Sequence, residues 1–490
     1  MNTLAGTPLP ATSAARSSAA MTVATKDWLE LRRDPRGRVL AVLVGLLMLL
    51  ALVSGALQFE RGHGERDAAQ AADQTLWRSQ GDKDPHGAAH FGQWAFKPPS
   101  LLALADPGVD AYSGGAVWME AHKRNEMQFR PARDAGVSAR MGGLTLAFVL
   151  QAVLPLVIIV LGFNAFSGER ERGTLRQLLG QGTTPWQLAV GKMCALACGL
   201  GWLLLPLAAL LALCGAWLAE PGQGGQAAAR AFGWTAGHAL YLAGFVALTV
   251  AVSALAPSSR AALVSLLALW LLLSFVAPRV MTEVARSAVP LPSAQDFRER
   301  ISAERTKTFG HDENHPAFAA YKSELLKQYG VQKVEDLPLN FRGLALRRDD
   351  EAGYAIHDRL FGELEWSIDR QDLLRAAPGA VLPLLAMQPW SMALAGTDTR
   401  AHRHFAQAAE QHRRVIQTIT SEDLIRNARY GDTRYVSPAA LWAKVPPFEY
   451  APPSAAWALA GTGPALGGLL LWLLLTGVFA AWSSRRLRAV

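Results

Sequence analysis

The sequence predicts an all-α polytopic membrane protein with six transmembrane helices and two extracytoplasmic insertions, the larger one mainly helical. Three observations predict this class. Six apolar runs approach or exceed the roughly 20 residues needed to cross the hydrocarbon core of a bilayer. Long polar stretches interrupt the series twice, and Lys and Arg gather beside alternate ends of the runs. The predicted spans are residues 39–57, 144–163, 188–218, 232–256, 261–276 and 464–482.

The composition agrees with this class. Hydrophobic residues make up 51% of the 490 residues, yet the mean hydropathy of +0.14 is too low for a chain that lies almost entirely in the membrane. Large polar parts must therefore accompany the spans.

Three elements are predicted before the first insertion. Residues 1–25 are rich in Ala, Ser, Thr and Pro and are expected to form a disordered tail, in which Met21 is an alternative start. Residues 26–38 form an amphipathic interface helix with its apolar side chains toward lipid. The run at 39–57 is longer than the 7–15 residues of a signal-peptide core, so a retained transmembrane helix is favoured over a cleaved leader.

The two insertions differ in character. Residues 58–143 contain Gly and Pro turns and scattered tryptophans, which favours a compact, loop-rich domain. Residues 283–463 are long enough for an ordinary domain and show apolar residues at three- and four-residue spacing, which predicts a large helical domain. The helices expected in it are residues 294–308, 316–329, 349–376 and 399–429.

Residues 144–282 hold spans two to five. Between the second and third spans lies a charged, helix-forming segment, residues 168–180, which is predicted to be a short interfacial helix. Its charged residues crowd the first turns, and Gly168 and Gly173 allow the chain to bend. The side chains that can meet lipid or a partner are Leu175, Leu178 and Leu179. Pro155 and Pro206 interrupt the two flanking spans, and a static kink is favoured over a flexing point because transmembrane helices tolerate proline.

The basic residues beside the spans predict the orientation. With six spans, all four basic groups fall on one side, which the positive-inside tendency makes cytoplasmic. Both termini are then cytoplasmic, and residues 464–490 form the sixth helix and a basic tail. The net charge of +8 is explained by topology, so no nucleic-acid partner is expected. The groups are Lys26, Arg32, Arg33, Arg36 and Arg38; Arg170, Arg172, Arg176 and Lys192; Arg260; and Arg485, Arg486 and Arg488.

Several kinds of chemistry have no motif in the chain. The nearest approach to a phosphate-binding loop, residues 189–193, lacks the first Gly and the final hydroxyl. No ATP-binding site, cofactor or enzymatic activity is therefore expected, and any ATP use belongs to a separate subunit. No Asp or Glu lies in the middle of a span, which argues against a proton-driven carrier. The three cysteines, Cys194, Cys198 and Cys214, all lie in the third span, where small helix-packing residues are expected rather than a metal site.

The histidines offer an enzymatic alternative. His311 and His315 are four residues apart and could share a helix face, but Asp312 stands where the zincin pattern places Glu. Gly310 and Pro316 indicate a turn instead of a helix interior. The remaining candidates are interpreted as solvated surface, so no metal site is expected; they are His86, His90, His402, His404 and His412.

The residues at this interfacial segment resemble a known family. Glu-Arg-Glu-Arg-Gly-Thr-Leu at 169–175, the Leu pair at 178–179, Thr-Thr-Pro-Trp-Gln-Leu at 183–188 and Gly-Lys at 191–192 resemble the link between the second and third spans of type-2 ABC transporter permeases. The basic amphipathic segment at residues 26–38 and the six-span arrangement also fit this family. Residues 388–398, with His402, Phe405 and the helix at 410–413, resemble the subset of these permeases that carries domain of unknown function 3526.

The resemblance implies a function and partners. The segment 168–180 would be a coupling helix docked in a groove of an ABC ATPase subunit, with the interface helix beside it. Such permeases lie in the bacterial inner membrane and work as homodimers or with a second homologous permease. ATP-driven closure of the ATPases would switch the spans between inward- and outward-facing states. Transport in this family is more often export, and no motif identifies the substrate. The implied contact residues are Glu169, Arg170, Glu171, Arg172, Gly173, Thr174, Leu175, Leu178, Lys26, Trp28 and Arg32.

Two alternatives stay open. The insertions are larger than in the plainest family members, and could cap the path, receive substrate or contact an envelope partner. The same fold could then act as an envelope scaffold that transmits force and passes no substrate. A membrane-anchored metalloenzyme using His311 and His315 is the third interpretation.

Overall fold

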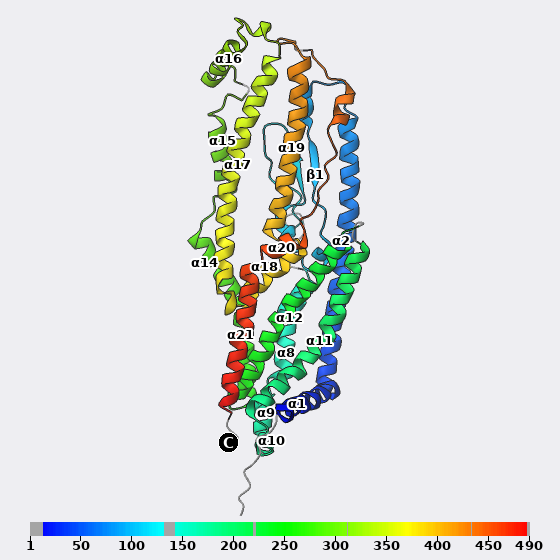
Figure 1. Ribbon diagram of the computed structural model, residues 1–490, viewed down its shortest axis with the longest axis vertical. Helices are drawn as coiled ribbons and strands as arrows, with labels where there is room; N and C mark the ends of the chain where they lie inside the picture. Colours follow the sequence, from blue (N-terminus) through cyan, green and yellow to red (C-terminus); the bar gives the residue numbers. More distant parts are fainter. Residues whose placement is uncertain (1–12, 132–142, 219–221, 311, 433, 488–490) are drawn as a thin grey trace, which may run out of the picture.

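Figure 1 shows the computed structural model, which describes residues 13–131, 143–218, 222–310, 312–432 and 434–487. The molecule is elongated, with a helix bundle at one end and the two insertions stacked beyond it. The described residues contain six helices that are long and apolar enough to cross a membrane, which confirms the predicted class. These are Pro35–Arg78, Leu146–Glu171, Pro185–Leu218, Gly224–Leu255, Ser259–Ala288 and Gly463–Arg485.

A sharp boundary separates α1 (Ser13–Arg33) from α2 (Pro35–Arg78). Asp34 between them is extended, with ψ of 121°, because a residue before proline avoids the helical region. The Asp34 carboxylate accepts the Arg36 amide at 2.9 Å and so caps α2. The interface helix therefore ends at Arg33 instead of residue 38.

The beginning of α1 also differs from the prediction. Residues 13–25, expected to be disordered, form its first part, while residues 1–12 lie outside the described part of the chain. The run is rich in Ala, a strong helix former, which composition alone could not distinguish from a tail.

α2 is much longer than the predicted span at 39–57. Its 44 residues correspond to about 66 Å at a rise of about 1.5 Å per residue. A hydrocarbon core of roughly 30 Å accounts for less than half of that length. The remaining part leaves the bundle and forms one wall of the insertions (Figure 1). The first insertion thus begins as a continuous helix instead of as loops.

Two spans contain a π-helical turn just before a proline. In the second span, η2 precedes Pro155, and in the fifth span η3 precedes Pro278. Proline lacks an amide proton, and the wider turn accommodates the missing hydrogen bond. The pieces are α7 (Leu146–Phe148), η2 (Val149–Val153) and α8 (Leu154–Gly162), and α13 (Ser259–Leu271), η3 (Leu272–Val276) and α14 (Ala277–Ala288). The fifth span is thereby longer than the predicted 261–276.

α12 (Gly224–Leu255) lies at the centre of the bundle, packed against α11 (Pro185–Leu218) and α21 (Gly463–Arg485). Glycine makes this close packing possible. A Cβ atom on Gly244 would lie 1.9 Å from Nε1 of Trp472, whose indole donates to the Tyr241 carbonyl at 3.1 Å. The Trp472 ring therefore fits only against a residue without a side chain.

α18 (Leu384–Ala395) was not among the predicted helices, and it contains Pro389 in its interior. It packs against α12 and α21 at the top of the bundle, and Arg230 of α12 fixes its C-terminal end. The Arg230 guanidinium donates to the carbonyls of Leu394 at 3.0 Å and Pro453 at 2.7 Å. The larger insertion is thus anchored directly on the spans.

α17 (Phe341–Ala376) and α19 (Thr399–Asn427) form the tall helices of the larger insertion, and α18 connects them. The first insertion contributes α3 (Pro85–Phe91) and an antiparallel pair of strands, β1 (Gln93–Phe96) and β2 (Ala116–Met119). A shared core joins both insertions to the outer half of α2, and it includes Trp77, Ala88, Phe405, Ile416 and Trp442. The insertions therefore form one packed unit.

The remaining elements complete the insertions. They are η1 (Leu101–Leu104), α4 (Asp110–Ser113), α15 (Ala294–Arg305), α16 (Pro316–Tyr329), η4 (Val334–Asp336), η5 (Ala377–Ala380), η6 (Ala439–Lys444) and α20 (Ala455–Ala460).

Two predictions, one about cysteines and one about histidines, need correction. Cys194 and Cys198 are exposed on α11 instead of packed between helices. His402 and His412 are not solvated surface, because each holds a buried ring nitrogen without a hydrogen-bond partner. Burial lowers the pKa of both imidazoles to about 4.

The proposed zinc pair is only partly within the described residues. His311 lies outside them, and His315 caps α16 by accepting the Ala317 amide at 3.2 Å. Residues 312–315 form a turn, as the flanking Gly and Pro predicted.

Candidate functional site

α1, α9 (Ser167–Glu171), α10 (Thr174–Gly180) and the last described turn of α21 gather at the end of the bundle opposite the insertions (Figure 1). This end, called the basic end below, carries the Lys and Arg residues that flank the spans. The single helix predicted at 168–180 is two short helices. Gly173 separates them with φ of 75°, a left-handed conformation that glycine adopts without strain.

A buried ion-pair network lies behind these helices. The Lys192 ammonium of α11 lies 2.9 Å from Oε1 of Glu169 in α9 and 3.1 Å from Oδ2 of Asp27 in α1. Lys192 is 5% exposed and Glu169 is 4% exposed. Buried charges of this kind are stable only when paired, and removing one partner is costly. The network therefore fixes α9 and α1 to the third span.

The next two side chains of α9 bind the link between the fourth and fifth spans. Arg170 donates to the carbonyls of Ala254 and Ala256 at 2.7 and 2.6 Å, at the C-terminal end of α12. A cation there interacts favourably with the helix dipole. Glu171 accepts from the amide and the hydroxyl of Ser259, both at 2.7 Å, at the N-terminal end of α13. α9 is therefore hydrogen-bonded to both ends of the link between α12 and α13.

These contacts divide the residues predicted to face a partner. Glu169, Arg170 and Glu171 are engaged with their own chain, and Leu175 is buried in the core. The exposed members are Arg172, Gly173, Lys26 and Arg32, and the half-buried members are Thr174, Leu178 and Trp28. The structure adds Arg176 and Gln177 to the exposed face of α10. Contact with a partner subunit stays a prediction for all of them.

Sequence reasoning missed Asp27 and the role of Lys192. One signal was present, since Lys192 lies inside an otherwise apolar run and a charge there needs a partner. The identity of that partner could not be read from the sequence, because Asp27 and Lys192 are far apart in the chain.

A second feature lies at the other end of the bundle. A cavity of about 1130 Å³ lies between α2, the chain around η1, α14, α17 and α18. Its lining is mixed, with Ala51, Leu104 and Phe148 on the apolar side and Arg286 and Arg375 among the polar groups. A cavity of this size and character can accept an amphipathic molecule.

A chain of buried polar groups begins beside this cavity. Gln151 Nε2 lies 3.3 Å from His238 Nε2, and His238 Nδ1 lies 2.9 Å from the Trp234 carbonyl. The Trp234 indole donates to Ser391 at 2.7 Å, and Ser391 donates to Asp106. Burial raises the pKa of Asp106, although the hydrogen bonds from Ser391 and from the Gly108 amide oppose that shift. The chain ties the insertion to the spans.

Two comparisons with known protein families cover most of the chain. Residues 21–302 match the family described as ABC-2 family transporter protein. Residues 294–451 match the domain of unknown function DUF3526. The two matches meet in α15. The first covers five spans together with α9, α10 and most of α1, and the second covers most of the larger insertion. No curated protein matches the chain.

Proposed function

The chain belongs to the ABC-2 family of transporter proteins and is a membrane permease subunit, and we propose that α1 and α10 form the surface through which a separate ABC ATPase drives it. Family membership implies the ATPase partner. The Glu169–Lys192–Asp27 network is the single observation that carries the choice of surface.

The network supports the proposal because it joins the exposed surface to the spans. A force that the ATPase exerts on α10 would be transmitted through α9 to Lys192 in the third span, because Glu169 of α9 pairs with Lys192. Through Arg170 and Glu171 it also reaches the ends of the fourth and fifth spans. A loop that merely connected two helices would need none of these contacts. α9 is the transmitting element, and the exposed side chains of α10 and α1 are the contacting ones.

The charge of this surface indicates the character of the groove on the ATPase that would bind it. Lys26 pairs with Glu30 at 3.3 Å, but the exposed Arg32, Arg172 and Arg176 keep the surface basic. Complementary acidic groups in the ATPase groove would favour docking. The same residues lie on the side that the positive-inside tendency assigns to the cytoplasm, where ATP is available. Both termini are then cytoplasmic and the insertions extracytoplasmic, as in a bacterial inner-membrane permease.

We propose transport, in the export direction, of an amphipathic substrate received by the cavity beside α14 and α17. The mixed lining of that cavity and its position at the junction of spans and insertions support this choice. The subunit would work as a pair, either with a second copy or with a homologous permease. A force-transmitting scaffold shares the same ATPase surface but has no use for such a cavity.

Charge reversal tests the docking surface. The double variant Arg172→Glu/Arg176→Glu changes two exposed side chains, one directly after α9 and one in α10. We expect it to abolish copurification of the ATPase after gentle solubilisation, and its crosslinking in membranes. The matched control, Arg342→Glu/Arg429→Glu, makes the same change in charge on exposed residues of the larger insertion and should retain the ATPase.

Equal retention of the ATPase by both variants would refute the docking surface. Substrate-stimulated ATPase activity in reconstituted vesicles then separates transport from the scaffold. A rate that no amphipathic compound changes, in a complex that still hydrolyses ATP, would favour the scaffold.

A further inference from the structure

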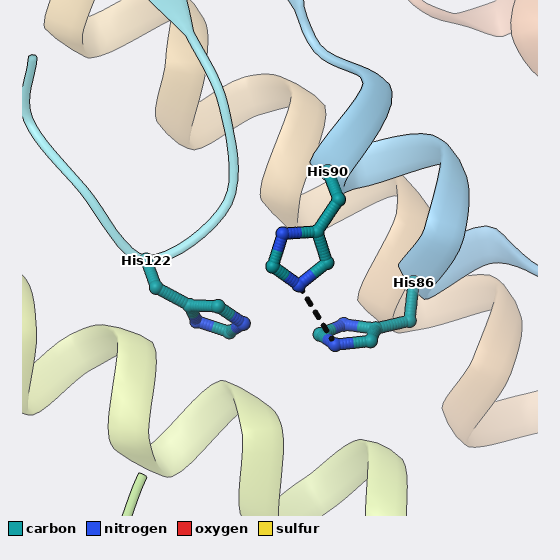
Figure 2. Close-up of side chains that lie close together, drawn as sticks. All are labelled: His86, His90 and His122. Carbon is teal, nitrogen blue, oxygen red and sulfur yellow. Dashed lines mark hydrogen bonds between the residues drawn. The ribbon is translucent and has the colours of Figure 1, made fainter. Parts of the chain in front are cut away.

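Three histidines of the first insertion converge at one point (Figure 2). His86 and His90 come from α3, and His122 comes from the turn that follows β2. One ring nitrogen of each lies within 4.8 Å of the corresponding nitrogen of the other two. The Nε2 atoms of His86 and His90 are 3.2 Å apart. Sequence reasoning interpreted His86 and His90 as solvated surface and gave His122 no role.

α3 holds its two histidines in fixed positions. Asp84 caps the helix by accepting the Gly87 amide at 2.8 Å, and Pro85 occupies the first turn. Residues four apart lie on one helical face, so both imidazoles point the same way. The opposite side of α3 is anchored because Ala88 is fully buried in the core of the insertions.

The third histidine is held from two sides. His122 has φ of 62°, a left-handed conformation that is unfavourable for a residue with a side chain and persists only where its surroundings enforce it. The neighbouring Ala121 amide donates to the Ala89 carbonyl of α3 at 3.0 Å. On the other side, Nδ1 of His122 lies 2.8 Å from Oδ1 of Asp350, a buried carboxylate of α17.

The contact between His122 and Asp350 has a specific chemical meaning. When Nδ1 donates to a carboxylate, the neutral ring presents Nε2 as its electron-pair donor. Metal-binding histidines are oriented in this way by a carboxylate on their second nitrogen. Ring packing alone would require neither this tautomer nor the convergence of ligand atoms from two segments.

The spacing also fits a metal. Zinc–imidazole bonds of about 2.0–2.1 Å in tetrahedral geometry place two ligand nitrogens about 3.3 Å apart. His86 and His90 already meet this spacing at 3.2 Å. A separation of 4.8 Å closes to the tetrahedral value by a shift of about 1.5 Å, within the reach of a side-chain rotation.

We propose that His86, His90 and His122 bind a divalent transition metal, with Zn²⁺ as the best match, and that Asp350 is the positioning residue for His122. Three imidazoles without a thiolate select zinc and its first-row neighbours over Mg²⁺ or Ca²⁺. The exposed position of His90 leaves the fourth coordination site accessible to water or to another ligand. The bound metal joins α3 to the β2 turn and, through Asp350, to α17.

Direct metal binding tests the site. The full-length protein, carrying a tag without histidine and stripped with a chelator, is titrated with Zn²⁺ against a chromophoric competitor. We expect one high-affinity equivalent. His86→Gln and His90→Gln should each lower the affinity at least about 100-fold, and Asp350→Asn about 10- to 100-fold. His63→Gln, an exposed histidine of α2, is the matched control and should bind as the native protein does.

Cobalt gives a second readout. Co²⁺ bound to the three imidazoles should show the visible absorption of a tetrahedral complex, and this absorption should be absent from the His86→Gln/His90→Gln double variant. Both substitutions are at accessible positions, so the fold is retained and can be checked by thermal unfolding without metal. Failure to bind Zn²⁺, or equal Zn²⁺ affinity in the native protein and the double variant, would overturn the proposal.

Discussion

The ammonium group of Lys192 lies 2.9 Å from the carboxylate of Glu169, and both side chains are almost fully buried at the basic end of the bundle. This pair connects the segment that faces the proposed ATPase with the third span. Without Lys192 the buried Glu169 carboxylate would lose its ion-pair partner, whereas Lys192 without Glu169 would keep Asp27.

Glu169→Gln is therefore expected to destabilise the protein although it changes the shape of the side chain very little. Removing one partner of a buried pair costs about 3–5 kcal/mol. Asp27 remains as a second partner of Lys192, so we expect the lower end of that range. The measurement is the thermal unfolding midpoint in detergent. The double variant Glu169→Gln/Lys192→Met should be less destabilised than the two single variants added together. Additive effects would show that the pair is not coupled.

The contact between Glu171 and Ser259 predicts a coupling defect with little loss of stability. Glu171 is exposed, and its carboxylate caps the N-terminal end of α13 from the surface. Glu171→Ala should therefore fold normally and still bind the ATPase, while the transport-coupled ATPase rate falls. Thr418→Ala in α19 serves as a control, because its exposed hydroxyl donates to the Arg414 carbonyl of the same helix, in the larger insertion. Native coupling in Glu171→Ala would contradict the proposed role of α9.

Gly244→Ala should destabilise the bundle by overpacking. The new methyl group would lie 1.9 Å from the Trp472 indole nitrogen, and such insertions typically cost about 1–3 kcal/mol. Gly477→Ala in α21 is the matched control, because no neighbouring atom lies within 4 Å of its added Cβ. The thermal midpoint of each variant decides the matter, and equal midpoints would mean that α21 can move away from α12 at no cost.

Acidification should weaken the insertions. Burial, helped by the nearby charges of Arg413 and Lys97, lowers the pKa of His357 and His402 to about 4, and burial alone does so for His412. The unfolded chain protonates these rings near pH 6.5, so it binds more protons than the folded chain below that pH. The contribution of these neutral histidines to the free energy of unfolding is fully present above about pH 6.5. It is lost as the pH decreases toward 4, by as much as about 3 kcal/mol for each histidine.

Thermal midpoints measured between pH 7 and pH 4 test this expectation. His412→Gln should flatten the dependence on pH, whereas the exposed substitution Gln407→Ala on the same helix should leave it unchanged. A midpoint that rises on acidification would reverse the sign and refute the explanation.

The sequence was most informative where the solvent imposes a rule. A span must be mostly apolar and must satisfy its backbone hydrogen bonds internally, so six helices could be located from the apolar runs alone. The pairing of Lys192 with Glu169 and Asp27 depends on how separate helices meet, and no local pattern encodes it. α18 was not predicted, and its interior Pro389 is unfavourable for a helix. Its packing against α12 is a long-range contact that no local pattern shows. His122 could not be placed beside His86 and His90 because the turn that carries it is fixed by long-range contacts.

α2 is one continuous helix, so a rotation at one end would move the other end as part of the same rigid element. With no hinge between Pro35 and Arg78, a rotation of about 5° at the basic end would displace the far end by about 6 Å, given its length of about 66 Å. A small rotation of α2 at the basic end would therefore produce a larger displacement at Trp77, where α2 packs in the core shared by both insertions. If α2 rotates as one body during transport, we expect the insertions to be displaced further than the spans.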